Sequence, residues 1–83
     1  MMVFYEFDWS SPTSYTYDAN GGKRTVEVST CIYRVDKPLK SFSCVKETTK
    51  DEQGNITQQK YRLAKGKFKF NSQEALKHFI TGH

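Results

Sequence analysis

The sequence predicts an α+β fold, an antiparallel β-meander sheet of about five strands packed by one short C-terminal helix. Three observations lead to this prediction. Apolar and polar residues alternate with a period of two over much of the first 70 residues. Turns rich in Gly, Asn, Asp and Pro separate the alternating stretches, and the period becomes helical after Asn71. A chain of 83 residues is enough for a single domain, residues 1–83, and too short for two.

The first part of the chain predicts two short strands. Aromatic and acidic residues alternate from Val3 to Trp9, and the alternation resumes from Thr13 to Tyr17 after an interruption by Ser-Ser-Pro. The segment Asp-Ala-Asn-Gly-Gly at residues 18–22 is the strongest turn signal in the sequence. Asn and Gly tolerate the positive φ angles that tight hairpins need, so we expect a hairpin there.

A long β-branched stretch, residues 24–35, carries apolar residues on both faces, which predicts a central strand or a bulge that switches faces. Asp-Lys-Pro-Leu at residues 36–39 then turns the chain into a strand over residues 40–48. A hairpin centred on Lys37 and Pro38 pairs residues whose numbers sum to 75. Cys31 then faces Cys44, and Tyr33 faces Phe42.

The last part of the chain predicts two more strands, a loop and the helix. A loop at residues 50–55 precedes a strand over 56–64, and residues 67–70 form a last short strand. Asn71 is the expected N-cap, with Glu74 completing a capping box, and Gly82 is placed to end the helix. A helix of about ten residues is unstable alone, so its apolar face must dock on the sheet. That face consists of Ala75, Leu76, Phe79 and Ile80.

The two cysteines admit two interpretations. A facing pair at Cys31 and Cys44 can form a disulfide or a redox switch, or it can consist of two reduced thiols that fill the core as small apolar groups. The start of the chain lacks the basic region of an export signal, so a cytoplasmic location is the expected default. Because disulfides are rare in that compartment, reduced thiols are the favoured interpretation.

No motif in the sequence predicts an enzyme, and we expect no cofactor and no metal. Glu6 and Asp8 share a strand face, but charged residues there are typical of a protected sheet edge rather than of a catalytic pair. His78 lies within the helix and has no nucleophile motif to serve. The cysteines and histidines also lack the short paired spacings of zinc ligands.

Charge is distributed unevenly, and this asymmetry suggests a binding surface. Residues 56–83 contain six basic residues and one acidic residue, a net charge of +5. If the apolar residues between them point inward, five cations share the outer face of one hairpin: Lys60, Arg62, Lys65, Lys67 and Lys69. Such a face suits the phosphate backbone of a nucleic acid. The alternative is an ordinary solvated face, since Lys commonly protects strand edges.

The acidic N-terminal part carries more aromatic rings than two short strands need for one buried face. Trp9, Tyr15 and Tyr17 are therefore candidates for a protein-docking patch, because aromatic residues are favoured at interface hot spots. The alternative is that these rings fill the core of a chain with few leucines.

Two functional hypotheses follow from the sequence. The first is a small non-enzymatic module that binds nucleic acid through the basic hairpin. The alternative is a protein-binding accessory or inhibitor of a phage-type mobile element, which blocks or adapts a host protein or nucleoprotein complex. No stretch is long and apolar enough to predict a membrane span. We expect a monomer, or a dimer that pairs through a strand edge.

Overall fold

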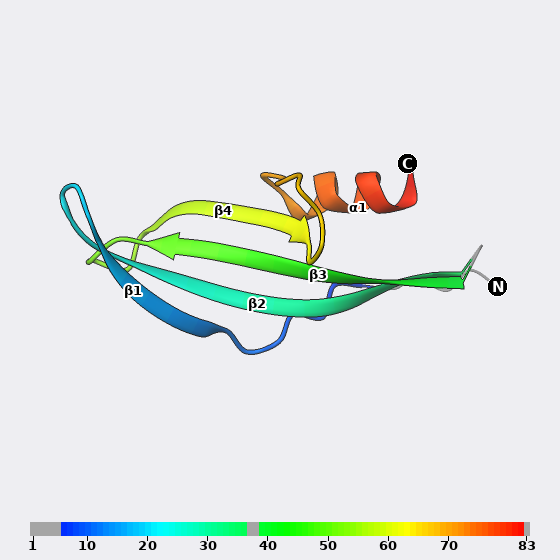
Figure 1. Ribbon diagram of the computed structural model, residues 1–83, viewed down its shortest axis with the longest axis horizontal. Helices are drawn as coiled ribbons and strands as arrows, with labels where there is room; N and C mark the ends of the chain where they lie inside the picture. Colours follow the sequence, from blue (N-terminus) through cyan, green and yellow to red (C-terminus); the bar gives the residue numbers. More distant parts are fainter. Residues whose placement is uncertain (1–5, 37–38, 83) are drawn as a thin grey trace.

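The computed structural model describes residues 6–36 and 39–82, and this part of the chain forms one open antiparallel sheet and a C-terminal helix (Figure 1). Its elements are β1 (Thr13–Ala19), β2 (Gly22–Asp36), β3 (Leu39–Lys50), β4 (Ile56–Leu63) and α1 (Gln73–Thr81). The strands lie in the order β1-β2-β3-β4, as a meander requires. The α+β class is therefore confirmed, but the described residues hold four strands rather than about five.

The register of the central hairpin is the one predicted. In the pairing of β2 with β3, Cys31 faces Cys44 and Tyr33 faces Phe42. Lys37 and Pro38, the centre of the predicted turn, lie outside the described residues. The prediction succeeded because a two-residue turn fixes the sum of paired residue numbers along the whole hairpin.

The turn between β1 and β2 uses glycine as the sequence predicts. Gly21 and Gly22 have φ angles of 87° and 125°, which lie in the region that side chains disfavour. A Cβ at Gly22 would also approach Glu52 Oε1 to 2.7 Å. Glu52 belongs to the β3–β4 turn and accepts a hydrogen bond of 2.8 Å from Lys23 N, so this carboxylate joins the two turns at one end of the sheet.

The strand predicted over Val3–Trp9 is wrong where it can be compared with the structure. Residues 1–5 lie outside the described part, and residues 6–10 belong to no strand. Instead, Phe7 stacks on Tyr33 with ring centroids 4.4 Å apart, and Ser10 N donates to Thr30 O at 2.9 Å. The alternation of aromatic residues arises because every second ring packs on the face of the sheet, a pattern that a strand would share.

The last strand, predicted over residues 67–70, is also wrong. Phe70 makes an isolated antiparallel bridge with Tyr61, in which each residue's N–H donates to the other's carbonyl. Residues 64–69 form a turn and an irregular segment instead. Gly66 N donates to Leu63 O at 3.0 Å, and this turn carries the chain off the edge of the sheet before a ladder can form.

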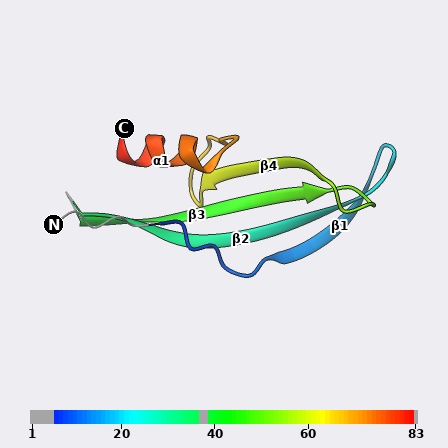
Figure 2. The same cartoon turned by 180° about the vertical axis from the view of Figure 1, so that it is seen from behind.

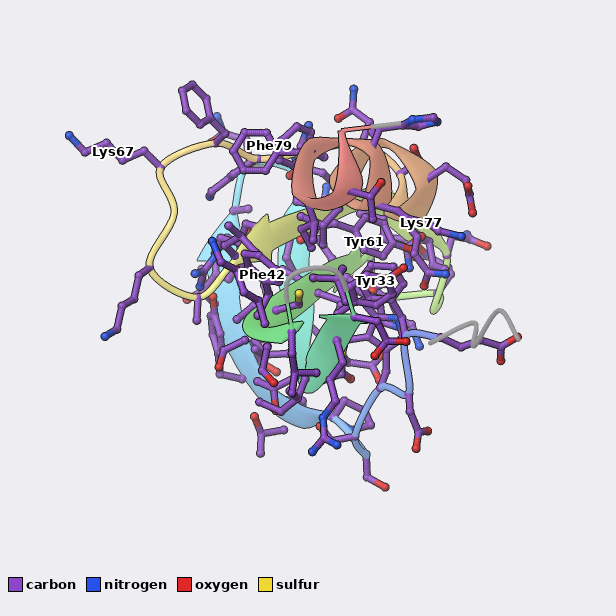
Figure 3. The ribbon with its side chains drawn as sticks, turned by 90° about the vertical axis from the view of Figure 1, so that its right-hand side faces the viewer. Tyr33, Phe42, Tyr61, Lys67, Lys77 and Phe79 are labelled. Atoms are coloured by element: carbon purple, nitrogen blue, oxygen red, sulfur yellow. The ribbon has the colours of Figure 1, made fainter. Side chains whose placement is uncertain are left out.

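The helix closes one side of the sheet over the central cysteine pair. Leu76 of α1 is fully buried in a cluster with Cys31, Tyr33 and Cys44. Figure 3 shows Tyr33, Phe42 and Tyr61 gathered between the strands and the helix. At the start of α1, Trp9 Nε1 donates to Gln73 Oε1 at 2.9 Å, so the N-terminal segment is fastened to the helix as well as to the sheet.

The caps of α1 were predicted correctly at one end. Gly82 ends the helix in the left-handed conformation, with φ 76°, as the sequence indicated. The N-cap, however, is Ser72 and not Asn71, because the Ser72 hydroxyl accepts the hydrogen bond from Ala75 N. The predicted capping box therefore does not form, since Glu74 is one residue too early for it.

The molecule is elongated, and the helix covers only part of it (Figures 1 and 2). Its principal extents are 50 × 22 × 20 Å, and the radius of gyration of 14.7 Å exceeds the value of about 12 Å expected for a compact chain of this length. The helix lies over the end of the sheet where β2 and β3 meet at their hairpin, and the end bearing the β1–β2 turn projects beyond it.

One face of the sheet, which we call the open face, points away from α1. Residues paired across neighbouring strands share a face, so Tyr15, Val26 and Thr49 lie together on it. Ile32 and Val45 lie on the same face, since their neighbours in sequence point into the core. On this face Val26 and Val45 are buried, whereas Tyr15 and Ile32 are exposed. Dimer formation through a strand edge stays a prediction. Of the two edge strands, β1 has more exposed residues than β4.

We expect the thiols to be inert in the folded protein. Burial first, and then the neighbouring Cys31, raises the pKa of Cys44 to about 12, and burial also raises the pKa of Cys31. Because the thiolate is the reactive form, iodoacetamide should alkylate both residues far more slowly in the native protein than in urea. Equal rates would contradict this arrangement, and the absence of free thiols after unfolding without a reductant would show that the pair is oxidised.

The same shift predicts a pH dependence of stability. The folded protein holds the thiol proton more tightly than the unfolded chain, so the stabilisation is complete below about pH 9 and is lost as pH rises toward 12. In urea denaturation, wild type should lose more of its unfolding free energy over this window than Cys44→Ala, which lacks the thiol at position 44. Parallel curves for the two proteins would refute the assignment.

Docking of the helix through Leu76 also leads to a prediction about stability. Leu76→Ala should lower the unfolding free energy by about 2–5 kcal/mol, a large part of the stability of a small domain. His78→Ala, whose side chain is exposed on the same helix, should change it by less than about 0.5 kcal/mol. Urea unfolding followed by circular dichroism measures both, and similar losses in the two variants would argue against docking through Leu76.

Candidate functional site

The candidate site is the segment between β4 and α1, residues 64–70, which we call the basic loop. It reads Ala-Lys-Gly-Lys-Phe-Lys-Phe and contains three lysines and no acidic residue. The irregular path of this loop, rather than the strand predicted there, sets the directions of its side chains. Its geometry depends on how its two ends are held.

The first end of the basic loop is held by the sheet. Ala64 N donates to Ser43 O on β3 at 2.8 Å. Arg62 Nη1 donates to the carbonyl oxygens of Leu63 at 3.4 Å and of Ala64 at 3.2 Å. Backbone and side chain thus fix the point where the chain leaves β4.

The second end is held by β4 and by the helix cap. Phe70 exchanges both backbone hydrogen bonds with Tyr61, at 2.7 and 2.8 Å. Lys60 Nζ donates to the side-chain oxygen of Asn71, and Ser72 begins the helix directly afterwards. The basic loop is therefore closed at both ends by residues of the same strand.

The five cations predicted to share one face fall into two groups. Lys60 and Arg62 point to the open face from β4 and hold the ends of the basic loop. Arg62 also forms a partly buried salt bridge with Glu47, with Nε and Oε1 3.1 Å apart. Both residues thus have polar partners within the protein: Glu47 neutralises Arg62, and Asn71 accepts a hydrogen bond from Lys60.

The remaining three, Lys65, Lys67 and Lys69, are exposed on the basic loop. Within residues 6–36 and 39–82, no carboxylate forms a salt bridge with any of them. Lys67 extends away from the body of the protein in Figure 3. Cations without acidic partners keep their full attraction for an external anion, because no internal charge offsets it.

Aromatic rings accompany these lysines, and the sequence predicted their positions poorly. Phe68 was expected to point into the core but is 67% exposed. Phe79, expected on the docking face of the helix, is 50% exposed. Its ring lies 5.1 Å from that of Phe70 and 6.0 Å from that of Phe68, so the three rings are contiguous.

A pocket of about 210 Å³ opens among these rings. It is lined by Leu63, Gly66, Lys67, Phe68, Phe70 and Phe79. The walls are largely apolar, and Lys67 supplies the charge at the rim. Sequence reasoning had no signal for the pocket, because it is formed where the basic loop folds back against the last turns of α1.

The predicted aromatic patch does not form as one surface. Trp9 packs on the helix side of the sheet, where its ring lies 5.9 Å from Tyr61 and 5.2 Å from Lys46 Nζ. Tyr15 and Tyr17 are exposed on the open face of β1, with ring centroids 6.5 Å apart. Trp9 is thus partly buried against the core, whereas the two tyrosines are exposed to solvent.

The other candidate residues do not come together into a site. Glu6 and Asp8 are exposed and lie in no strand, and His78 is exposed on α1. Among the residues that the structure describes, no group of His, Cys, Asp and Glu is placed to hold a metal ion. No helix in this part of the chain is long and apolar enough to cross a membrane.

The basic loop is therefore the best-supported candidate for a binding surface, because it combines unneutralised positive charge with exposed rings and an apolar pocket. Comparison of the chain with protein-family models, with curated proteins and with solved structures finds no match.

Proposed function

We propose that this protein is a non-enzymatic nucleic-acid-binding module and that Lys65, Lys67 and Lys69 of the basic loop contact the phosphate backbone. The observation that carries the proposal is the absence, within the described residues, of any acidic partner for these three lysines. Such cations displace counterions from a nucleic acid, and this release drives binding. The cytoplasmic location expected from the sequence fits this role.

The other two predicted cations, Lys60 and Arg62, have a different role in this proposal. Lys60 and Arg62 hold the ends of the basic loop, so they present the lysines instead of meeting the phosphates first. Holding a loop in place before binding reduces the conformational entropy lost on binding. We therefore assign them positioning roles in the proposed interface.

The alternative, a protein-binding accessory or inhibitor of a phage-type element, has one supporting observation. Tyr15 and Tyr17 stand exposed on the open face, as does Ile32. Exposed aromatic residues are typical of protein interfaces. Copurification after nuclease treatment separates the alternatives: a host protein lost from Tyr15→Ser/Tyr17→Ser but kept by a basic-loop variant would favour this second function.

The proposed function predicts a strong dependence of binding on salt. The variant Lys65→Gln/Lys67→Gln/Lys69→Gln should bind mixed-sequence DNA and RNA, single- and double-stranded, with a much flatter dependence. Each lost phosphate contact lowers the slope of log K against log salt by about 0.7 to 0.9, so three contacts account for about 2.1 to 2.7 units. Fluorescence anisotropy titrations at several salt concentrations measure this slope.

A matched control removes the same charge elsewhere. Lys23 near the β1–β2 turn, Lys40 at the start of β3 and Lys77 on α1 lie outside the basic loop. Their triple substitution to Gln should leave most of the slope intact. Equal effects of the two triple variants would reduce the interaction to net charge and overturn the assignment to the basic loop, and an absence of binding at low salt would overturn the function itself.

A further inference from the structure

The pocket beside the basic loop contains more apolar surface than phosphate binding requires. Phe68 and Phe79 expose 67% and 50% of their surfaces, and neither is needed to fill the cluster around Leu76. Large exposed rings grouped around a concavity are uncommon on soluble surfaces unless they bind something. Phosphate contacts alone therefore do not account for the exposed rings of this pocket, which indicate a ligand with an apolar group.

The size and walls of the pocket restrict that occupant. Its volume of about 210 Å³ exceeds the roughly 150 Å³ of an engineered protein cavity that accommodates benzene. Phe79 lies within ring-contact distance of both Phe68 and Phe70, and all three rings line the pocket. A flat ring of similar size matches this surface by stacking.

The charge around the pocket restricts the occupant further. Lys67 lines the rim, and Lys65 and Lys69 flank it on the same short loop. The occupant must then join a flat apolar ring to a negatively charged chain. A single-stranded nucleic acid has both groups within one nucleotide, whereas a duplex hides the faces of its bases in the stack.

We propose that the pocket receives an unpaired base of single-stranded nucleic acid, which stacks on Phe68 and Phe79 while Lys65, Lys67 and Lys69 hold the adjoining phosphates. This inference rests on the proposed nucleic-acid function and names its ligand class. Because the pocket walls are largely apolar, few groups can read the hydrogen-bonding edge of the base. Binding is therefore selective for unpaired bases and tolerant of their identity.

The decisive comparison uses three probes of equal length: an oligothymidylate, the corresponding abasic oligonucleotide and a duplex. The abasic strand keeps the phosphates and lacks the rings. In anisotropy titrations at fixed salt, wild type should bind the oligothymidylate at least about fivefold more tightly than either of the others, the lower bound for one stacked base.

Variants of the two rings then test the pocket directly. Phe68→Ala and Phe79→Leu should weaken binding of the oligothymidylate by about 5- to 150-fold and leave binding of the abasic strand unchanged. Their salt slopes should equal that of wild type, since no cation is lost. Tyr15→Ala removes an exposed ring on the other side of the sheet and should have no effect. Circular dichroism confirms folding of each variant, and Phe79→Leu keeps an apolar side chain on α1.

The outcomes separate this inference from the function on which it rests. Equal binding of all three probes with a slope that depends on the lysines would overturn the base pocket and leave the phosphate interface standing. No binding of any probe would overturn both. Displacement of the oligothymidylate by an acidic peptide containing phenylalanine, at lower concentration than by free oligothymidylate, would assign the pocket to a protein partner and overturn the base assignment.

Discussion

The packing of Leu76 on the cross-strand cysteine pair is the contact on which the rest of the structure depends. An isolated meander of this length has no second layer against which to bury its apolar face. Leu76 supplies that layer where Cys31 and Cys44 face each other, and their small side chains leave room for it. Larger residues at this pair would lift the helix away from the strands, since cores are close-packed.

The position of the helix in turn determines the basic loop. The N-cap of α1 is Ser72, and Leu76 of this helix packs over the cysteines, so the chain leaves β4 and returns within residues 64–71. Strand pairing at residues 67–70 is replaced by a turn, because the Leu63 carbonyl, which a ladder would pair with Phe68, accepts from Gly66 N instead. Only the bridge between Phe70 and Tyr61 survives, and the residues before it are directed outward. The lysines are thus exposed on a turn and an irregular segment rather than on a strand.

The sequence was most informative where a few neighbouring residues, such as those of a turn, determine the conformation or the pairing of a longer segment. The pairing of Cys31 with Cys44 followed from one two-residue turn, and Gly21, Gly22 and Gly82 adopt the conformations expected of glycine. It failed where alternation has two physical causes. Phe7 and Trp9 alternate with acids because they cover the sheet, and this periodicity is the same as that of a strand. The pocket was invisible because its lining comes from two elements whose approach is a tertiary property.

The exposed rings also bear on why the loop combines charge with apolar surface. Phe79 packs on Phe70, and Phe70 is tied to β4, so the ring surface that faces solvent is held by the same contacts that close the loop. A rigid ring loses little conformational entropy when a second ring stacks on it. Three closely spaced lysines on one loop repel one another. Because they have no acidic partners in the described part of the chain, this repulsion increases the free-energy cost of folding. Both features at one place cost stability there, and the proposed single-stranded ligand, with a ring and a negative charge in each nucleotide, would offset both costs.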